Sequence, residues 1–491
     1  MKIHNTLSRK KEELVTLASG EARMYVCGVT VYDLSHVGHA RSAIVFDVIR
    51  RYLLFKGYRV TFVKNFTDVD DKIIARANAE GLTSRDVSER YIAAYRADMA
   101  TLGVLPGDVE PKATDHIPQM IALIERLIAG GFAYVVEGDV YFEVRSFPAY
   151  GKLSGRNLED LLVGARVEVD ERKRDPRDFA LWKATKPGEP SWESPWGHGR
   201  PGWHIECSAM AMQYLGPSLD IHGGGEDLVF PHHECEIAQS EGATRAPFVR
   251  MWIHNGFVNF AAEKMSKSLG NTLTIREFAR RHDPEAIRLW LLGTHYRSPV
   301  EFGDDRVRES ARALERFRAL IDEADRLAPR AGGSRYATET GPGHVEALLA
   351  AVSDPELARV TAARVEAFVG AMDDDINTPA ALAALFDLSR DLHRYRDGVS
   401  RGDKRKEAFV QGVDVLIRLG QRALGLFQRA PAVDGPTEEV RVEAERLVAE
   451  RETARRQREW KRADELRARV QALGATVVDT PSGPRLKWGG P

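Results

Sequence analysis

His36 and His39 flank Val37 and Gly38 near the start of the chain. Two histidines three positions apart can share one face of a helix and donate hydrogen bonds to phosphate oxygens. Gly38 would let a ligand approach the backbone, and a helix N-terminus favours anions. The same pattern also fits a turn with two surface histidines. HVGH therefore indicates phosphate chemistry only together with a second signal.

That second signal lies far downstream, where Lys264 and Lys267 occur in the sequence KMSKS, followed by LGN. Two lysines in a loop rich in serine, glycine and asparagine make a mobile cationic clamp, which suits the charge that develops on a leaving pyrophosphate. A lone lysine pair is more often part of a solvated basic loop. The two motifs together, with HVGH before KMSKS, are a much more specific signal than either motif alone.

Four residues of types that bind zinc lie on three distant segments: Cys27, Cys207, His232 and Glu236. His232 and Glu236 are four positions apart and so project from the same helical face. Two thiolates, an imidazole and a carboxylate form a zinc-type ligand set. The spacing matches no zinc ribbon or finger, and the cysteines could equally be buried apolar residues. His233 and Cys235 are further candidates.

The elements that must position these residues begin with a βαβ unit. Residues 23–27 (RMYVC) have the character of a buried strand, residues 40–55 carry apolar side chains at helical spacing, and residues 59–63 (RVTFV) form a second strand. Gly57 is suited to end the helix. Such a unit predicts a parallel sheet, with ligands beyond the carboxyl ends of its strands, where HVGH lies.

The composition narrows the class of protein. Hydrophobic residues make up 43% and charged residues 29%, which is typical of a soluble globular chain. The net charge of −2 means that a nucleic-acid site must be a local basic patch. We expect no membrane span and no secretory signal, and hence a cytoplasmic protein. Three cysteines in 491 residues cannot form a disulfide framework.

Residues 451–470 (RETARRQREWKRADELRARV) hold eight Lys or Arg against four Asp or Glu, with Trp460 among them. The commoner structure for such a run is a solvated helix laced with ion pairs. A basic helix with an aromatic side chain also suits RNA phosphates and a stacked base.

Several further segments resemble the cysteinyl-tRNA synthetases, a family of class I aminoacyl-tRNA synthetases, over nearly the whole chain. They are MYVCG, NFTDVDDK, GWHIECSAM, DIHGGG and FPHHE, together with HVGH and KMSKS. The resemblance implies that L-cysteine is activated with ATP to cysteinyl-adenylate and passed to the 3′ end of tRNA(Cys). Val29 is a departure, because the family usually has proline there.

The resemblance also implies an architecture: an α/β fold with a Rossmann-type parallel-sheet catalytic domain, an inserted module, a helical bundle and a small α+β anticodon-binding unit. The sheet is expected to resume near Trp203 after the insertion. The expected bounds are 1–115 and 200–255 for the two catalytic halves, 116–199 for the inserted connective module, 256–305 for the stem-contact region carrying KMSKS, 306–430 for the bundle and 437–491 for the anticodon-binding unit.

The family's site residues carry over as follows. His36, His39, Lys264 and Lys267 would be catalytic, and the ATP site would comprise His36, Gly38, His39, Gly223, Gly224, Asp227 and Lys267. Thr67 and Trp203 would contact the substrate cysteine. Cys27, Cys207, His232 and Glu236 would hold one zinc ion per subunit, and Mg²⁺ would accompany ATP. Cys235 stays unassigned, and a monomer is expected.

Two other functions fit parts of the pattern. A mycothiol-pathway ligase shares this catalytic domain but joins cysteine to an amino sugar, and it is expected to lack a full anticodon-binding unit. A catalytically silent, synthetase-like RNA-binding protein would not need HVGH, KMSKS and all four zinc-type ligands. The roughly fifty residues after Pro436 and the intact motifs favour the tRNA ligase.

Overall fold

A computed structural model describes most of the chain: residues 1–157, 171–260, 263–264, 273–329, 335–336, 340–402, 405–428, 438–457, 459–473, 475–480 and 483–488. The chain divides into two compact units, Met1–Gln428 and Arg429–Pro491. Among the helices described, none has both the length and the apolar character needed to cross a bilayer. The predicted linker at 430–436 lies outside the described residues.

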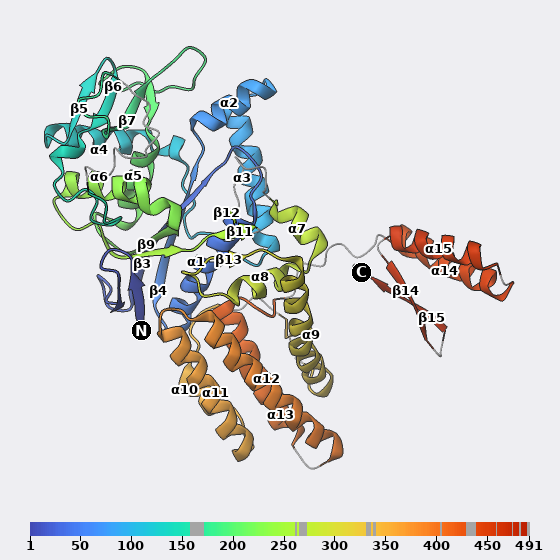
Figure 1. Cartoon of the computed structure of the whole chain (residues 1–491). Coiled ribbons are helices and arrows are strands. Elements are labelled where there is room, and N and C mark those ends of the chain that lie inside the picture. The colour runs from blue at the N-terminus through green and yellow to red at the C-terminus, as the bar shows by residue number, and fades with distance from the viewer. Residues whose placement is uncertain are drawn as a thin grey trace. The chain divides into compact units, whose positions relative to one another are not determined.

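The centre of the first unit is a parallel sheet of four strands, in the order β10-β9-β3-β4 (Figure 1). The strands are β3 (Glu21–Thr30), β4 (Arg59–Thr67), β9 (Leu219–Gly225) and β10 (Val249–Asn255). This confirms the predicted α/β class. The sheet resumes at Leu219, later than expected, because Trp203 begins a helix, α5 (Trp203–Leu215), instead of a strand.

Helix α1 (Val37–Phe55) joins β3 to β4 and completes the predicted βαβ unit. It starts three residues before the predicted helix, since the side chain of His36 caps it by accepting a hydrogen bond from the Gly38 amide. It ends before Gly57, whose φ of +89° is left-handed and suits a residue just past a helix. HVGH therefore forms the N-terminus of α1, at the carboxyl end of β3.

A separate antiparallel sheet, β5-β6-β7-β8, lies between β4 and β9 in the chain. Its strands are β5 (Ala133–Val136), β6 (Asp139–Phe142), β7 (Phe179–Ala184) and β8 (Gly199–Pro201). Glu137 and Gly138 both have positive φ, as a tight hairpin turn between β5 and β6 requires. The strand-like alternation of residues 135–144 in the sequence thus corresponds to two strands of a hairpin, with Gly138 in the turn between them. The module predicted at 116–199 contains this sheet, although its bounds stay a prediction.

The other elements before the bundle are mostly short. Strands β1 (Lys2–Asn5) and β2 (Lys10–Glu13) form a hairpin, and β11 (Val258–Phe260), β12 (Glu263–Lys264) and β13 (Val300–Glu301) form a small sheet. The helices are α2 (Asp71–Glu80), α3 (Ser84–Thr101), α4 (Ile117–Ala129), α6 (Glu234–Thr244), α7 (Ile275–Arg281) and α8 (Pro284–Leu292). Short helical turns are η1 (Ala113–His116), η2 (Val144–Ser146), η4 (Glu226–Leu228) and η5 (Val229–His233).

Helices fill the rest of the first unit, as predicted for residues after 306. They are α9 (Asp304–Leu327), α10 (Val345–Leu349), α11 (Pro355–Asp373), α12 (Thr378–Arg401), α13 (Lys406–Leu419) and η7 (Gly420–Leu424). The predicted apolar face of α9 is buried along Leu314, Phe317, Leu320, Ile321 and Ala324. Figure 1 shows α10 to α13 running side by side.

The second unit is a small α+β structure with its own core. Helices α14 (Glu438–Arg456) and α15 (Trp460–Ala472) precede an antiparallel pair, β14 (Ala475–Thr480) and β15 (Gly483–Trp488). Its core side chains are Leu447, Leu466, Val470, Ala475 and Val477, together with a few neighbours.

A buried ion cluster connects α1 to α8 and η7. Asp47 accepts hydrogen bonds from Arg51, at 2.8 Å, and from Arg288 of α8, and all three side chains are buried. Arg288 also donates to the Leu424 carbonyl of η7 at 2.8 Å. Burial alone would raise the pKa of Asp47, but the two guanidinium groups hold it below its usual value. Its stabilising contribution is therefore present above the usual pKa and is lost only as pH falls through the lowered one.

Replacing Asp47 by asparagine should destabilise the protein strongly, because it leaves two buried guanidinium groups without a counter-charge. We expect a loss of about 3–5 kcal/mol in the free energy of unfolding, measured by urea denaturation followed by circular dichroism. Asp305→Asn is the matched control, since Asp305 pairs with Arg308 at the surface, and it should change stability by less than about 0.5 kcal/mol. Equal effects of the two substitutions would contradict the role of the cluster.

Candidate active site and metal centre

The four residues of the predicted zinc set converge beneath the carboxyl ends of the strands. One donor atom from each of Cys27, Cys207, His232 and Glu236 lies within 4.8 Å of the others. Cys27 Sγ is 3.5 Å from Cys207 Sγ and 3.2 Å from Glu236 Oε1, and His232 Nε2 is 3.1 Å from Glu236 Oε1. Tertiary structure thus brings together side chains that are far apart in the chain.

Each donor comes from a different element. Cys27 lies toward the carboxyl end of β3, and Cys207 lies on α5. His232 lies in η5, after a cis peptide bond between Phe230 and Pro231, and Glu236 lies in the first turn of α6. Pro231 suits the first position of a helix, and the sequence therefore predicts a helix start there, but regular α-helix begins only at Glu234.

Neighbouring side chains hold these donors in place. His204 Nδ1 lies 2.9 Å from His232 Nδ1, and His222 Nε2 lies 2.8 Å from Glu236 Oε2. Such partners orient metal-binding side chains and fix the tautomers of histidines. Sequence reasoning did not identify His204 or His222 as neighbours of this centre. They stand in the segments GWHIEC and DIHGGG, but only the tertiary fold brings His204 to His232 and His222 to Glu236.

A second combination also converges: Cys27, His222, His233 and Glu236. It includes His233, one of the alternatives from the sequence, but it has a single sulfur donor. His222 Nε2 is already hydrogen-bonded to Glu236, and His233 Nδ1 lies 2.7 Å from His254 Nε2. The set with two thiols therefore suits a zinc ion better. Cys235 points elsewhere, with its sulfur 3.2 Å from the Tyr150 hydroxyl.

The electrostatics of the first set favour a cation. Burial raises the pKa of Cys27 well above its usual value. Burial also acts to raise the pKa of Cys207, but hydrogen bonds with Cys27 and His232 outweigh it and bring that pKa to about 6. Burial lowers the pKa of His232, whereas Cys207 and Glu236 raise it to about 10. A divalent cation would replace the shared protons among these buried donors.

The two HVGH histidines share one face, with ring centroids 3.9 Å apart. His36 Nδ1 accepts from the Gly38 amide at 3.1 Å, and His39 Nδ1 accepts from the His36 amide at 3.2 Å. Because each Nδ1 is an acceptor, the neutral rings carry their proton on Nε2. The pair is thereby prepared to donate hydrogen bonds through Nε2.

These histidines line a cavity of about 550 Å³. Of the residues predicted to bind substrates, its wall contains His36, Gly38, His39, Trp203 and Asp227. Cys27 belongs both to this wall and to the four-donor group. Lys64 and Lys72, which sequence reasoning missed, line it as well.

Of the described residues predicted to bind ATP or cysteine, Thr67, Gly223 and Gly224 do not line this cavity. Thr67 is buried and donates to Glu206 Oε2 at 2.8 Å. A Cβ atom on Gly223 would lie 2.3 Å from the Phe46 ring, and one on Gly224 would lie 2.7 Å from Leu228. These glycines allow close packing around β9. Their predicted contact with ATP, and that of Thr67 with cysteine, stay predictions.

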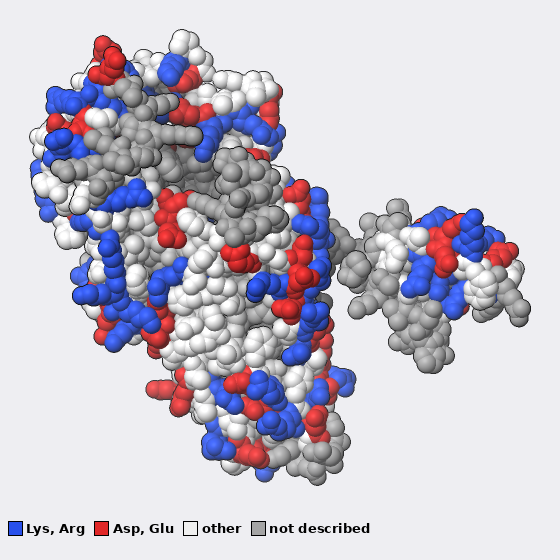
Figure 2. Space-filling model, viewed as in Figure 1, with Lys and Arg blue, Asp and Glu red and all other residues white. Residues whose placement is uncertain are grey.

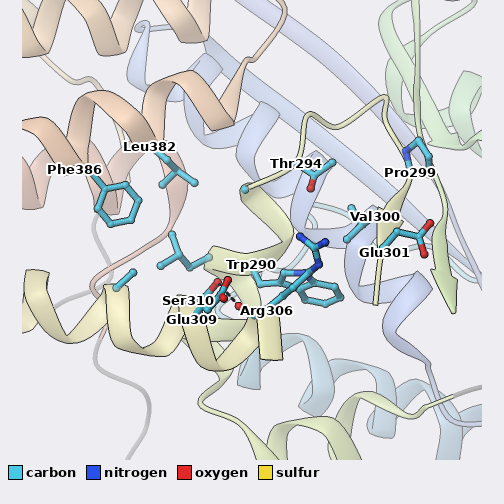
Figure 3. Close-up of a pocket in the computed structure, with 13 residues that line it drawn as sticks. Trp290, Thr294, Pro299, Val300, Glu301, Arg306, Glu309, Ser310, Leu382 and Phe386 are labelled. Carbon is cyan, nitrogen blue, oxygen red and sulfur yellow. Dashed lines mark hydrogen bonds between the residues drawn. The ribbon is translucent and has the colours of Figure 1, made fainter. Parts of the chain in front are cut away.

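The KMSKS segment is mostly outside the described residues. Lys264 ends β12, where its backbone pairs with Asn259 of β11, and Lys267 is not described. Another cavity, of about 450 Å³, lies among α8, β13, α9 and α12 and contains none of the predicted site residues. Figure 3 shows Trp290, Arg306 and Phe386 around it.

Comparison with known proteins gives three consecutive family matches. Residues 13–312 match the tRNA synthetases class I (C) catalytic domain, residues 367–428 match the DALR domain, and residues 437–485 match the cysteinyl-tRNA ligase anticodon binding domain. Cysteine–tRNA ligases of Trichlorobacter lovleyi and Geobacter sulfurreducens are 50% and 51% identical to the chain, over 99% of the chain and 99% of each relative.

Solved structures support the fold. A methionyl-tRNA synthetase of Mycobacterium tuberculosis, in complex with methionyl-adenylate, aligns with a TM-score of 0.58 at 16% identity, over 82% of this chain and 92% of that chain. The LeuRS of Agrobacterium radiobacter K84, in a complex with tRNA and LeuAMS, aligns with a TM-score of 0.59 at 13% identity, over 87% and 86%. With its catalytic and anticodon-binding domains and its full-length relatives, the chain belongs to the cysteinyl-tRNA synthetase family of class I aminoacyl-tRNA synthetases.

Proposed function

We propose that the chain is a cysteine–tRNA ligase that activates L-cysteine with ATP in the HVGH cavity. The observation that carries this proposal is the position of Cys27, which lines the cavity and belongs to the four-donor centre. A substrate thiol can thus meet the centre while its carboxylate lies nearer the HVGH histidines.

The amino-acid specificity would follow from zinc held by Cys27, Cys207, His232 and Glu236. When bound there, zinc supplies a Lewis acid that prefers a thiolate to a neutral hydroxyl. A shape difference as small as that between cysteine and serine gives a pocket only about 1–3 kcal/mol, whereas an accuracy of about 10⁴ needs about 5–6 kcal/mol. The donor set fits this ion, since it joins two thiols to an imidazole and a carboxylate whose outer oxygen is oriented by His222.

In the activation step, the carboxylate of cysteine attacks the α-phosphate of ATP, and pyrophosphate leaves. The Nε2–H groups of His36 and His39, at the N-terminus of α1, would stabilise the charge on the phosphate oxygens. Lys264 and Lys267 would stabilise the leaving pyrophosphate, with Mg²⁺ bound to ATP. Asp227 would accept hydrogen bonds from the ribose of ATP. Trp203, which is 41% exposed, would cover the substrate cysteine.

In the second step, the cysteinyl group passes to the terminal adenosine of tRNA(Cys). The second unit would contact the anticodon. Trp460 there is 60% exposed, which suits base stacking, although Arg455 and Arg462 pair with Glu452 and Glu459 as in an ordinary solvated helix. On the face seen in Figure 2, basic and acidic side chains are mixed, so RNA would be held by local patches. The cytoplasm as the place of action and a monomeric state stay predictions.

The activity has a direct test. The purified protein should catalyse cysteine-dependent ATP–pyrophosphate exchange and then charge tRNA(Cys). Absence of exchange would sink the enzyme proposal and favour an RNA-binding protein. Exchange without charging, but with ligation of cysteine to an amino sugar, would favour the mycothiol-pathway ligase.

The metal centre predicts the behaviour of Cys207→Ser. Loss of a neighbour that merely orients a ligand already costs about 10–100-fold in metal affinity, so loss of a ligand should cost more than about 100-fold. Zinc content, measured by atomic emission, should fall below one per chain, and the preference for cysteine over serine in the exchange reaction should drop. Cys235→Ser is the matched control, because its sulfur contacts Tyr150, and it should keep its zinc. Stoichiometric zinc in Cys207→Ser would remove this residue from the centre.

The HVGH geometry predicts a defect in rate for His39→Ala. Removing one oriented donor to a developing charge costs about 10²–10³-fold in kcat, so exchange should slow by about that factor, with little change in the KM for cysteine. His39→Gln keeps an N–H donor and a residue suited to the capping box of α1, and it should retain more activity. His198→Ala, at an exposed position, controls for the loss of any histidine. A raised cysteine KM with normal kcat would contradict this role.

A further inference from the structure

A second cavity, of about 490 Å³, adjoins the HVGH cavity and shares Asp227, Gly256 and Phe257 with it. Three arginines, Arg9, Arg156 and Arg297, line this second cavity. They come from the β1–β2 hairpin, from the segment before residue 157 and from the segment before β13. Nothing in the proposed activation step uses them.

Two of the arginines are held in place without a carboxylate partner among the described residues. Arg9 adopts a left-handed φ of +60° at the hairpin tip and donates to the Ser154 carbonyl at 3.2 Å. A Cβ atom on Gly155 would lie 1.7 Å from the Arg9 guanidinium, which occupies the space that a side chain at position 155 would fill. The guanidinium of Arg156 lies over the Phe230 ring, 4.6 Å from its centroid. Both cations are therefore positioned, and no carboxylate of the described residues neutralises them.

The third arginine is positioned by a buried carboxylate. Asp375 is fully buried and accepts from Arg297 at 2.9 and 2.7 Å and from the Tyr296 hydroxyl at 2.7 Å. Asp375 and Ile376 both have left-handed φ values, +65° and +49°, which are costly for residues other than glycine. The strained backbone at Asp375 and Ile376 thus lies where Asp375 orients the side chain of Arg297. That side chain is still 39% exposed.

The remaining wall groups complement the other parts of a ribonucleotide. Guanidinium groups bind phosphate, the carboxylate of Glu226 can accept hydrogen bonds from ribose hydroxyls, and the Phe230 ring with its stacked Arg156 offers a surface for a base. A bare anion would leave the Glu226 carboxylate unexplained. The volume also lies in the range of ordinary ligand sites.

We propose that the second cavity binds a ribonucleotide from the single-stranded 3′ end of the tRNA, next to the terminal one that reacts in the HVGH cavity. This inference rests on the proposed function. An RNA strand whose last nucleotide lies at the reaction centre must leave the HVGH cavity on one side. The wall that the two cavities share, at Asp227, Gly256 and Phe257, leads directly to these arginines. Free ATP is less suited, because its phosphates are expected at HVGH.

The test uses Arg156→Gln and Arg9→Gln in the full-length protein, since both residues are exposed and their replacement should not disturb folding. Loss of one charged hydrogen-bond donor should raise the KM for tRNA in charging by about tenfold or more. The slope of log KM against log salt should fall by about 0.7 for each phosphate group that the variant no longer binds. The effect should be confined to the tRNA-dependent step. Arg156→Lys should recover most of the salt slope, because it keeps the charge.

Arg59→Gln is the matched control, because Arg59 is a surface arginine paired with Glu21 and lies in neither cavity. A raised ATP KM in tRNA-free exchange with an unchanged tRNA KM would assign the cavity to ATP and overturn the inference. Unchanged values in both assays would overturn it as well. Failure of the wild-type protein to catalyse exchange would instead reject the proposed function, so the two failures are distinguishable.

Discussion

A fully buried carboxylate, Glu236, holds the centre of the first unit together. It contacts Cys27, His222 and His232 at 2.8–3.2 Å. A carboxylate without compensating partners is very costly inside a protein, so β3, α5, β9 and α6 must meet in one arrangement. Burial raises the pKa of Cys27, whereas interactions with neighbouring donors lower the pKa of Cys207 and raise that of His232. The centre is therefore a constraint on the fold and, at the same time, a site whose charges call for a cation.

The parallel sheet explains why the chemistry gathers at one edge. The carboxyl ends of β3 and β9 lie side by side, so HVGH, which follows β3, faces the same cavity as Gly225 and Asp227, at the end of β9 and just after it. The module inserted between β4 and β9 is attached to α6, because the Tyr150 hydroxyl contacts the Cys235 sulfur and the Ser154 amide donates to Glu234.

Helix α1 links the site to the helical bundle. Its N-terminus presents the HVGH histidines, and near its middle Asp47 holds Arg288 of α8, which donates to η7. Asp373, at the end of α11, accepts from Tyr52 on α1 at 2.8 Å, and Asp375 directs Arg297 into the second cavity. Residues 371–379 (AMDDDINTP) thus connect the bundle to both α1 and the proposed RNA path.

The sequence by itself determined the elements that depend on neighbours along the chain: the βαβ unit, the HVGH helix, the apolar face of α9 and the types of the four zinc-type donors. Local periodicity and capping decide such features. The sequence did not reveal His204 or His222 beside the four-donor centre, Lys64 and Lys72 in the cavity wall, or that Gly223 packs against Phe46. These depend on contacts between segments far apart in the chain. Only the tertiary structure decided them, because burial and distance at the sheet edge are set by how β9, α5 and α6 pack, and no local spacing encodes that packing.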